Sequence, residues 1–148
     1  NTALDVLSVA GPYLDGEIAY RRGELDAAVK KLEEATRLED TLKYDEPPGW
    51  TVPSRHALGA FLLEAGKSKE AEAVYRQDLL KYPENGWSLW GLAQALEAQG
   101  RTAEAKAVAK RFEKAWKRAE IELSASCLCV KGKKMACAPG VSATSARP

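Results

Sequence analysis

The stretch Leu92–Gly100 reads LAQALEAQG, and the stretch Leu58–Gly66 reads LGAFLLEAG. Their closing glycines lie 34 residues apart, and an alanine stands five residues after each of them. Gly23 is followed by an alanine at the same offset, so a third copy precedes these two. A fixed period of this length is typical of repeat proteins, in which each unit packs mainly against its neighbours.

The recurring residues have physical reasons to recur. Each of the three glycines ends an amphipathic run and can adopt the left-handed backbone conformation that closes a helix. Small residues at matched places let two helices approach closely, and larger residues fill the space around them. The small set is Gly16, Gly59, Ala93, Ala28, Ala71 and Ala105, and the large set is Leu25, Leu32, Leu62, Tyr75, Leu96 and Phe112. The pattern therefore predicts three antiparallel helix pairs.

The period and the spacing of small and large residues resemble the tetratricopeptide repeat family over about residues 9–120. Pro83 matches the family's terminal proline, whereas Asp40 and Lys117 occupy that place in the other copies. The residues that stand where the family has its first large aromatic are Pro12, Arg55 and Leu89. The resemblance implies an all-α fold, a right-handed superhelical solenoid of three helix-turn-helix repeats, and a role in binding other proteins.

Four runs also resemble the C-terminal region of a group of uncharacterised tetratricopeptide proteins: Tyr44–Trp50, Arg55–Gly59, Glu70–Arg76 and Pro83–Leu89. This resemblance implies that the chain is a fragment of a longer protein. It also suggests that the first run and Trp87 act together. We therefore expect the first run to lie against the start of the helix that carries Trp87.

Six helices are expected in a repeat domain over residues 1–123, followed by an irregular tail over residues 124–148. Their expected bounds are about Asp15–Arg22, Leu25–Leu38, Pro53–Ala65, Lys69–Lys81, Gly86–Gln99 and Ala103–Leu123. An earlier start of the first helix is left open, with an interruption near Gly11 and Pro12, because proline breaks helices. The expected N-caps are Ser68, Asn85 and Thr102. The long last helix should cap the final repeat, and residues 138–148 are expected to be disordered.

A proline-rich insertion separates the first two repeats. Their turn glycines are 43 residues apart, nine more than the period, and the excess lies at about residues 41–52. It contains Tyr44, Pro47, Pro48 and Trp50. Consecutive prolines exclude a helix, and exposed aromatic rings forgo hydrophobic stabilisation. We therefore expect this loop to fold back onto the solenoid.

The concave face of a solenoid is lined mainly by the first helix of each pair, and it is where repeat proteins bind their partners. Aromatic side chains on that face would bury much area for little lost entropy. The alternative is that Trp87 and Trp90 pack inside the superhelix. The residues projected onto this face are Tyr13, Glu17, Tyr20, His56, Ala60, Leu63, Trp87, Trp90 and Gln94.

One specialisation of the resembled family is absent. Its members that grip the free carboxylate of chaperone tails do so with Lys, Asn and Arg on the concave face. The corresponding positions hold Tyr13, Glu17, Ala57, Trp87 and Gly91. A chaperone-tail adaptor is therefore disfavoured, and an apolar or aromatic partner segment is expected instead.

The candidate catalytic and metal-binding residues do not form a recognisable site in the sequence. His56 is the single histidine, so it cannot belong to a multi-histidine metal site, and we interpret it as a packing or hydrogen-bonding residue. Asp45 and Glu46 are neighbours in a proline-rich loop, where a solvated turn is more usual than an acid–base pair. No enzymatic role is expected.

The tail carries two small clusters. Cys127, Cys129 and Cys137 are one thiolate short of a structural zinc site, so redox-active or exposed thiols in a reducing compartment are expected. The second cluster is Lys131, Lys133 and Lys134. It is too short to indicate binding to a membrane or to nucleic acid.

Charge and hydropathy restrict the partners. The chain has 22 basic and 21 acidic residues, so its net charge of +1 supplies no field that attracts nucleic acid or an anionic membrane. No apolar run approaches the ~18 residues of a membrane span, and no signal peptide is evident. We expect a cytoplasmic scaffold that binds a protein or peptide without a cofactor. The alternatives are an assembly or homo-oligomerisation element of a larger repeat protein, and a non-catalytic auxiliary domain of an enzyme.

Overall fold

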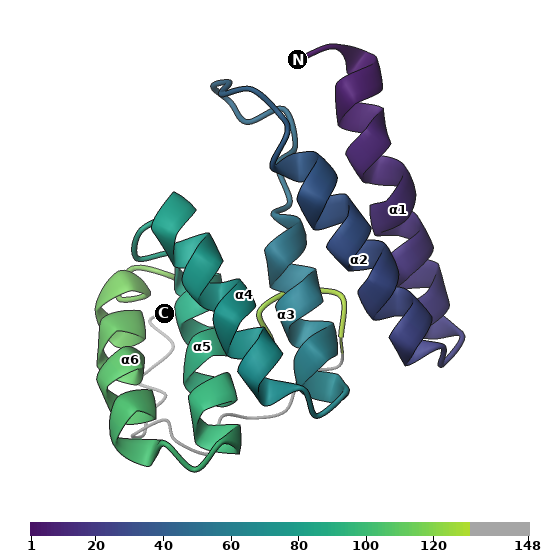
Figure 1. The fold of residues 1–148 in the computed structure, drawn as a ribbon. Coiled ribbons are helices and arrows are strands. Elements are labelled where there is room, and N and C mark those ends of the chain that lie inside the picture. Colours follow the sequence, from purple (N-terminus) through teal and green to yellow (C-terminus); the bar gives the residue numbers. More distant parts are fainter. Residues whose placement is uncertain (131–148) are drawn as a thin grey trace, which may run out of the picture.

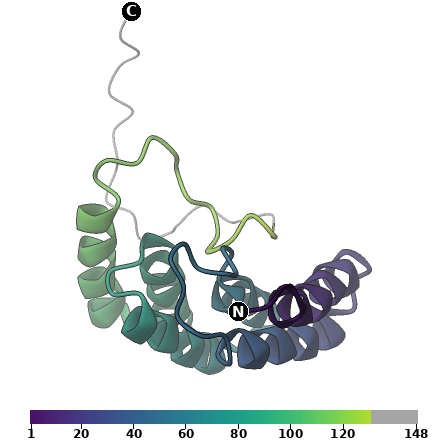
Figure 2. The ribbon, with the colours of Figure 1, turned by 90° about the horizontal axis from the view of Figure 1, so that it is seen from above.

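The computed structural model describes residues 1–130 of the 148-residue chain, and these residues form six helices and no strand. The helices are α1 (Ala3–Arg21), α2 (Leu25–Glu39), α3 (Ser54–Glu64), α4 (Ser68–Lys81), α5 (Gly86–Ala98) and α6 (Thr102–Ala115). They pair in sequence order, and the pairs stack side by side into an arc (Figures 1 and 2). The predicted all-α helical-repeat solenoid is confirmed.

The turn inside each helix pair is closed by the glycine that the repeat predicted. Gly23, Gly66 and Gly100 have φ values of 80°, 72° and 73°. Added Cβ atoms at these glycines would meet no neighbour, so the backbone conformation alone calls for glycine there.

The first helix begins much earlier than its expected core and is continuous. The Thr2 hydroxyl accepts a hydrogen bond from the Asp5 amide, and the Asp5 carboxylate accepts one from the Thr2 amide. This capping box satisfies two amide donors, which offsets the one helical hydrogen bond that Pro12 removes. The predicted interruption near Gly11 and Pro12 is therefore wrong.

One of the three predicted N-caps is confirmed. The Asn85 side chain accepts a hydrogen bond from the Trp87 amide at 2.9 Å and caps α5. Ser68 and Thr102 are instead the first residues of α4 and α6, preceded by caps without a side-chain hydrogen bond. The glycine turns explain this difference, because the residue after each glycine already bonds back to the preceding helix and fixes where the next one starts.

The last helix ends at Ala115, so the prediction of a long helix reaching about Leu123 is wrong. The Trp116 ring stacks on Phe112 with 5.7 Å between ring centroids, and it packs so closely on Gly86 that a Cβ there would overlap it. The Trp116 indole N–H donates to the Ile121 carbonyl at 2.8 Å. These contacts turn the chain back toward the body of the arc. We call residues 116–130 the return segment.

Two departures from the family pattern compensate one another at the junction of the first two pairs. Asp40 follows α2 and Arg55 lies in the first turn of α3, and they form a bidentate ion pair at 2.8 and 2.5 Å. These hydrogen bonds hold the pKa of Asp40 below its usual value. The neighbouring Glu39 carboxylate accepts a hydrogen bond from the Ser54 amide at 2.7 Å. Polar contacts thus join these repeats where the family has a proline and an aromatic residue.

Tyr75 occupies a slot between neighbouring repeats. It belongs to α4, is fully buried, and lies so close to Gly59 of α3 and Gly91 of α5 that a Cβ on either glycine would overlap its ring. The ring fits between the two helices because neither glycine has a side chain. The tyrosine hydroxyl thereby reaches the concave side of the arc.

The proline-rich insertion folds back, but onto the opposite end of the arc from the one expected. The Trp50 ring packs edge-on against Tyr13 of α1, with 5.5 Å between centroids, and a Cβ on Gly49 would lie 3.4 Å from Val6. The hypothesis that this loop lies against the start of α5 is therefore wrong. Trp87 instead contacts His56 and Trp116. Tyr44 is 85% exposed, and its hydroxyl hydrogen bonds to Glu46 in the same loop, so the expectation that it packs is also wrong. Pro47 and Pro48 are exposed.

Candidate binding groove

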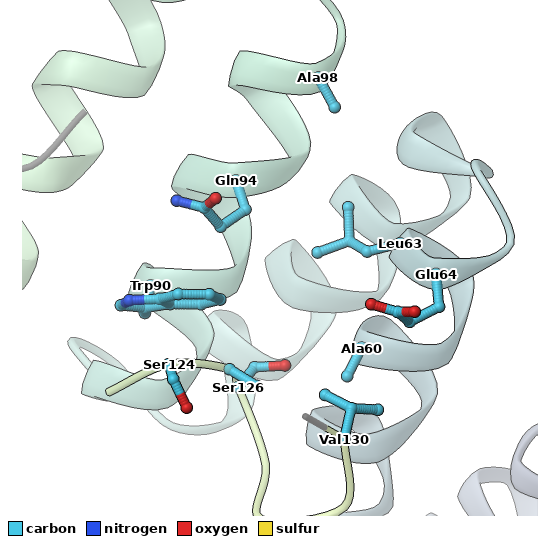
Figure 3. A pocket seen from close by; sticks show the side chains of 10 residues that line it. Ala60, Leu63, Glu64, Trp90, Gln94, Ala98, Ser124, Ser126 and Val130 are labelled. Atoms are coloured by element: carbon cyan, nitrogen blue, oxygen red, sulfur yellow. The ribbon is translucent and has the colours of Figure 1, made fainter. Parts of the chain in front are cut away.

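A groove of about 200 Å³ lies on the concave side of the arc, between α3 and α5. Figure 3 shows Trp90 and Gln94 of α5 facing Leu63 and Glu64 of α3 across it. Ala60 lies toward the α3 side, and Ala98 lies at the end of α5. The lining is mainly apolar, with an amide and a carboxylate at its edge, which is the usual composition of a small ligand or peptide site.

The return segment forms the remaining wall of the groove. Ser124, Ala125, Ser126 and Val130 line it, and Ala125 and Ser126 are 5% and 1% exposed. Figure 2 shows this segment crossing the open side of the arc. The Arg21 guanidinium of α1 donates to the Cys129 carbonyl at 3.1 Å and holds the far end. Residues 124–130 are non-helical, as expected of the tail, but they pack against the helices.

Ser126 is held by two groups at the floor of the groove. Its hydroxyl donates to the His56 backbone carbonyl at 2.9 Å and lies 2.6 Å from the Tyr75 hydroxyl. Because the single Ser126 proton is committed to the carbonyl, the Tyr75 hydroxyl is the donor of the second bond. Burial raises the pKa of Tyr75, which keeps this phenol protonated.

Four residues that the sequence projected onto the concave face come together at the groove: Ala60, Leu63, Trp90 and Gln94. Trp90 is 6% exposed, so its ring belongs partly to the core, as the alternative interpretation allowed. The other projected residues contact the α1 side or the start of α5.

The tyrosines of α1 pack toward its neighbours. Tyr20 stacks on Phe61 with 4.4 Å between centroids, and Tyr13 contacts Trp50. Burial, with smaller contributions from Glu17 and Glu39, raises the pKa of Tyr13 to about 12. Burial also raises the pKa of Glu17. These groups are therefore partly desolvated and lie outside the groove lining.

His56 belongs to a buried polar cluster. Its Nε2 lies 3.1 Å from the Asp78 carboxylate, and the same carboxylate oxygen accepts a hydrogen bond from the Ser88 hydroxyl at 2.5 Å. A catalytic triad places the imidazole between the serine and the acid, whereas here the acid is central. All three side chains are at most 6% exposed. The cluster therefore joins α3, α4 and α5 without offering a nucleophile to the groove.

Trp87 lies beside this cluster. It stacks on His56 with 6.5 Å between centroids and meets Trp116 edge-on at 5.8 Å. Trp87 thus anchors the start of the return segment, and it does not line the groove.

Cys127 and Cys129 are joined by a disulfide, with 5.2 Å between their Cα atoms. The expectation of free thiols is therefore wrong for these two residues. Cys137, the three lysines at 131–134 and residues 138–148 lie outside the described residues. Within residues 1–130, no group of three or more potential ligands is placed to hold a metal. None of the helices in that range is long and apolar enough to cross a membrane.

Sequence reasoning missed the residues that complete the groove. Helical periodicity stops at about Leu123, so nothing in the repeat placed Ala125 and Ser126 on the concave face. Tyr75 was recognised as a large core residue, but its hydroxyl function was not. The available signal was the second glycine, Gly91, which together with Gly59 opens the slot for its ring.

Comparison with known proteins identifies one part of the chain. Residues 62–115, which span the end of α3 through α6, match a family model described as tetratricopeptide repeat. Searches of the curated proteins and of the solved structures found no match.

Proposed function

Since residues 62–115 match the tetratricopeptide repeat family, whose repeats generally mediate protein–protein interaction, we propose that the concave groove binds an extended segment of a partner protein. The proposal includes a cytoplasmic location and no catalytic role of its own. The groove between α3 and α5 is the observation that carries it.

The chemistry of the groove supports an apolar segment. Trp90 supplies a rigid aromatic surface, Leu63 an aliphatic one, and Gln94 can both donate and accept hydrogen bonds with a peptide backbone. Glu64 is the charged group at the edge. A partner that presents a free carboxylate would meet this acid rather than a cation, which matches the absent carboxylate clamp.

The test uses ten-residue random peptides displayed on phage and selected against the full chain. Ala98 is exposed at the groove, so Ala98→Arg adds a long side chain there at little cost in stability. Ala107 is also an exposed alanine, in α6, so Ala107→Arg is the matched control. We expect Ala98→Arg to weaken binding of the selected peptides at least tenfold and Ala107→Arg to leave it unchanged, as measured by fluorescence anisotropy.

Peptides that bind Ala98→Arg as tightly as the unaltered chain would place the interaction elsewhere. A selection that enriches no peptide would equally contradict the proposed function.

A second candidate is self-association through α1. Its outer face exposes Leu4, Leu7, Leu14 and Ile18 by 77%, 64%, 59% and 40%, at the three- and four-residue spacing of a helix-packing stripe. The stripe is nearly symmetric about Gly11, where an added Cβ would meet nothing. Two antiparallel copies would therefore match leucine to leucine or isoleucine, and the acidic first turn of one would approach the basic last turn of the other.

Light scattering of the full chain tests this second candidate. We expect a concentration-dependent dimer that Leu7→Glu and Leu14→Glu together convert to a monomer, because four charges would be buried in the pair. Lys30→Glu, on the exposed surface of α2, is the control and should leave the dimer intact. A monomer at every concentration of the unaltered chain would exclude the candidate.

A further inference from the structure

The return segment occupies the groove in the manner of a bound peptide. It crosses the concave side as non-helical chain, buries Ala125 and Ser126 there, and leaves Leu128 90% exposed on its outer side. The segment thus presents small side chains and Val130 to the groove, and its Leu128 points away from it. A segment that served only to cover the core would be expected to bury its leucine instead.

The floor of the groove presents a donor and an acceptor side by side. The Tyr75 hydroxyl donates, and the His56 carbonyl accepts. A single group that satisfies both must accept one hydrogen bond and donate another at the same atom, which a hydroxyl does. A phosphorylated serine has no such proton and is too large for a site that leaves Ser126 1% exposed.

The return segment does not fill the groove. About 200 Å³ remains between it and the side chains of Leu63, Trp90 and Gln94. Beyond Ser126, its polar attachment to the helices in the described residues is the Arg21 bond to the Cys129 carbonyl. A partner segment that also fills the open volume can therefore compete with it.

We propose that residues 121–130 are an internal ligand of the groove, which selects an extended segment with an unmodified hydroxyl side chain between small residues, so that a partner must displace them to bind. This inference rests on the proposed function and adds the chemistry of the partner. The intramolecular attachment makes the effective concentration of this internal ligand high, which lowers the apparent affinity of any partner.

The test adds a labelled peptide of residues 121–130, in its oxidised form, to variants of the full chain. Ala125→Glu places a charge at a buried position and should release the return segment while leaving Tyr75 and His56 in place. Leu128→Glu makes a similar apolar-to-acid change at an exposed position of the same segment and is the matched control. We expect Ala125→Glu to bind the peptide at least tenfold more tightly than the unaltered chain or Leu128→Glu.

The hydroxyl is tested with a second peptide that carries Ser126→Ala. Without the hydroxyl, the buried Tyr75 donor and the buried His56 carbonyl stay unpaired. Binding of this peptide to the Ala125→Glu chain should therefore be about tenfold weaker. Equal binding of the two peptides would overturn the hydroxyl selection. Equal binding of the first peptide to the released and unaltered chains, or no binding to either, would overturn the internal ligand.

A measurement without an acidic substitution covers the case in which Ala125→Glu fails to fold. Tyr75→Phe removes one hydroxyl, and it should speed amide hydrogen exchange of residues 124–130 severalfold while the exchange of α3 and α5 stays unchanged. Unchanged exchange at 124–130 would contradict the role of the Tyr75 donor. If phage-selected peptides still bound at the groove in that case, the proposed function would be supported and this inference would be wrong.

Discussion

Replacing Gly91 by alanine is expected to lower the free energy of unfolding by about 3 kcal/mol, at the upper end of the usual cost of overpacking a core. The added Cβ would overlap the Tyr75 ring, which is confined on its other side by Gly59. The ring cannot move away without opening the contact between α4 and both of its neighbours. Urea denaturation followed by circular dichroism measures the change.

Gly11→Ala is the matched control for this substitution. Gly11 is also inside a helix, but an alanine Cβ there would meet nothing within 4 Å. The higher helix propensity of alanine should then stabilise the protein by about 0.5–1 kcal/mol. If both variants shifted stability equally, the slot around Tyr75 would not be a tight constraint.

Asp78→Ala is expected to lower the free energy of unfolding by about 3 kcal/mol. Asp78 is fully buried, and its carboxylate is the shared partner of His56 and Ser88. Its removal leaves two buried polar side chains unpaired and opens a space where α3, α4 and α5 meet. Thermal and urea unfolding both report the loss.

Asp15→Ala provides the surface comparison. Asp15 pairs with Lys31 at 3.5 Å, and both side chains are largely exposed, so the change should fall within about 0.5 kcal/mol. A similar small effect at Asp78 would show that the buried cluster contributes little to the junction of the three helices.

The sequence predicted the repeat architecture because its evidence is periodic. Gly23, Gly66 and Gly100 recur at fixed offsets, and each has the positive φ that closes a helix pair. The family-model match over residues 62–115 falls on the two copies with the same 34-residue spacing. Local propensity was a poorer guide, since Pro12 suggested a break that the capping box at Thr2 and the tertiary packing of α1 override.

The contents of the groove could not be predicted in the same way. The position of Ser126 depends on hydrogen bonds to residues 51 and 70 positions away, and no periodic signal connects such distant segments. Trp50 illustrates the same limit. An aromatic residue in a proline-rich loop was expected to pack, but only the fold shows that its partner is Tyr13 and not Trp87.

The four tryptophan indoles provide the most direct test of groove binding. Trp90 lines the groove and Trp50 packs against α1 at the far end of the arc. In a two-dimensional NMR titration of the full chain with a phage-selected peptide, we expect the Trp90 indole signal to shift and the Trp50 signal to stay in place. A shift of Trp50 with Trp90 unchanged would contradict binding in the concave groove.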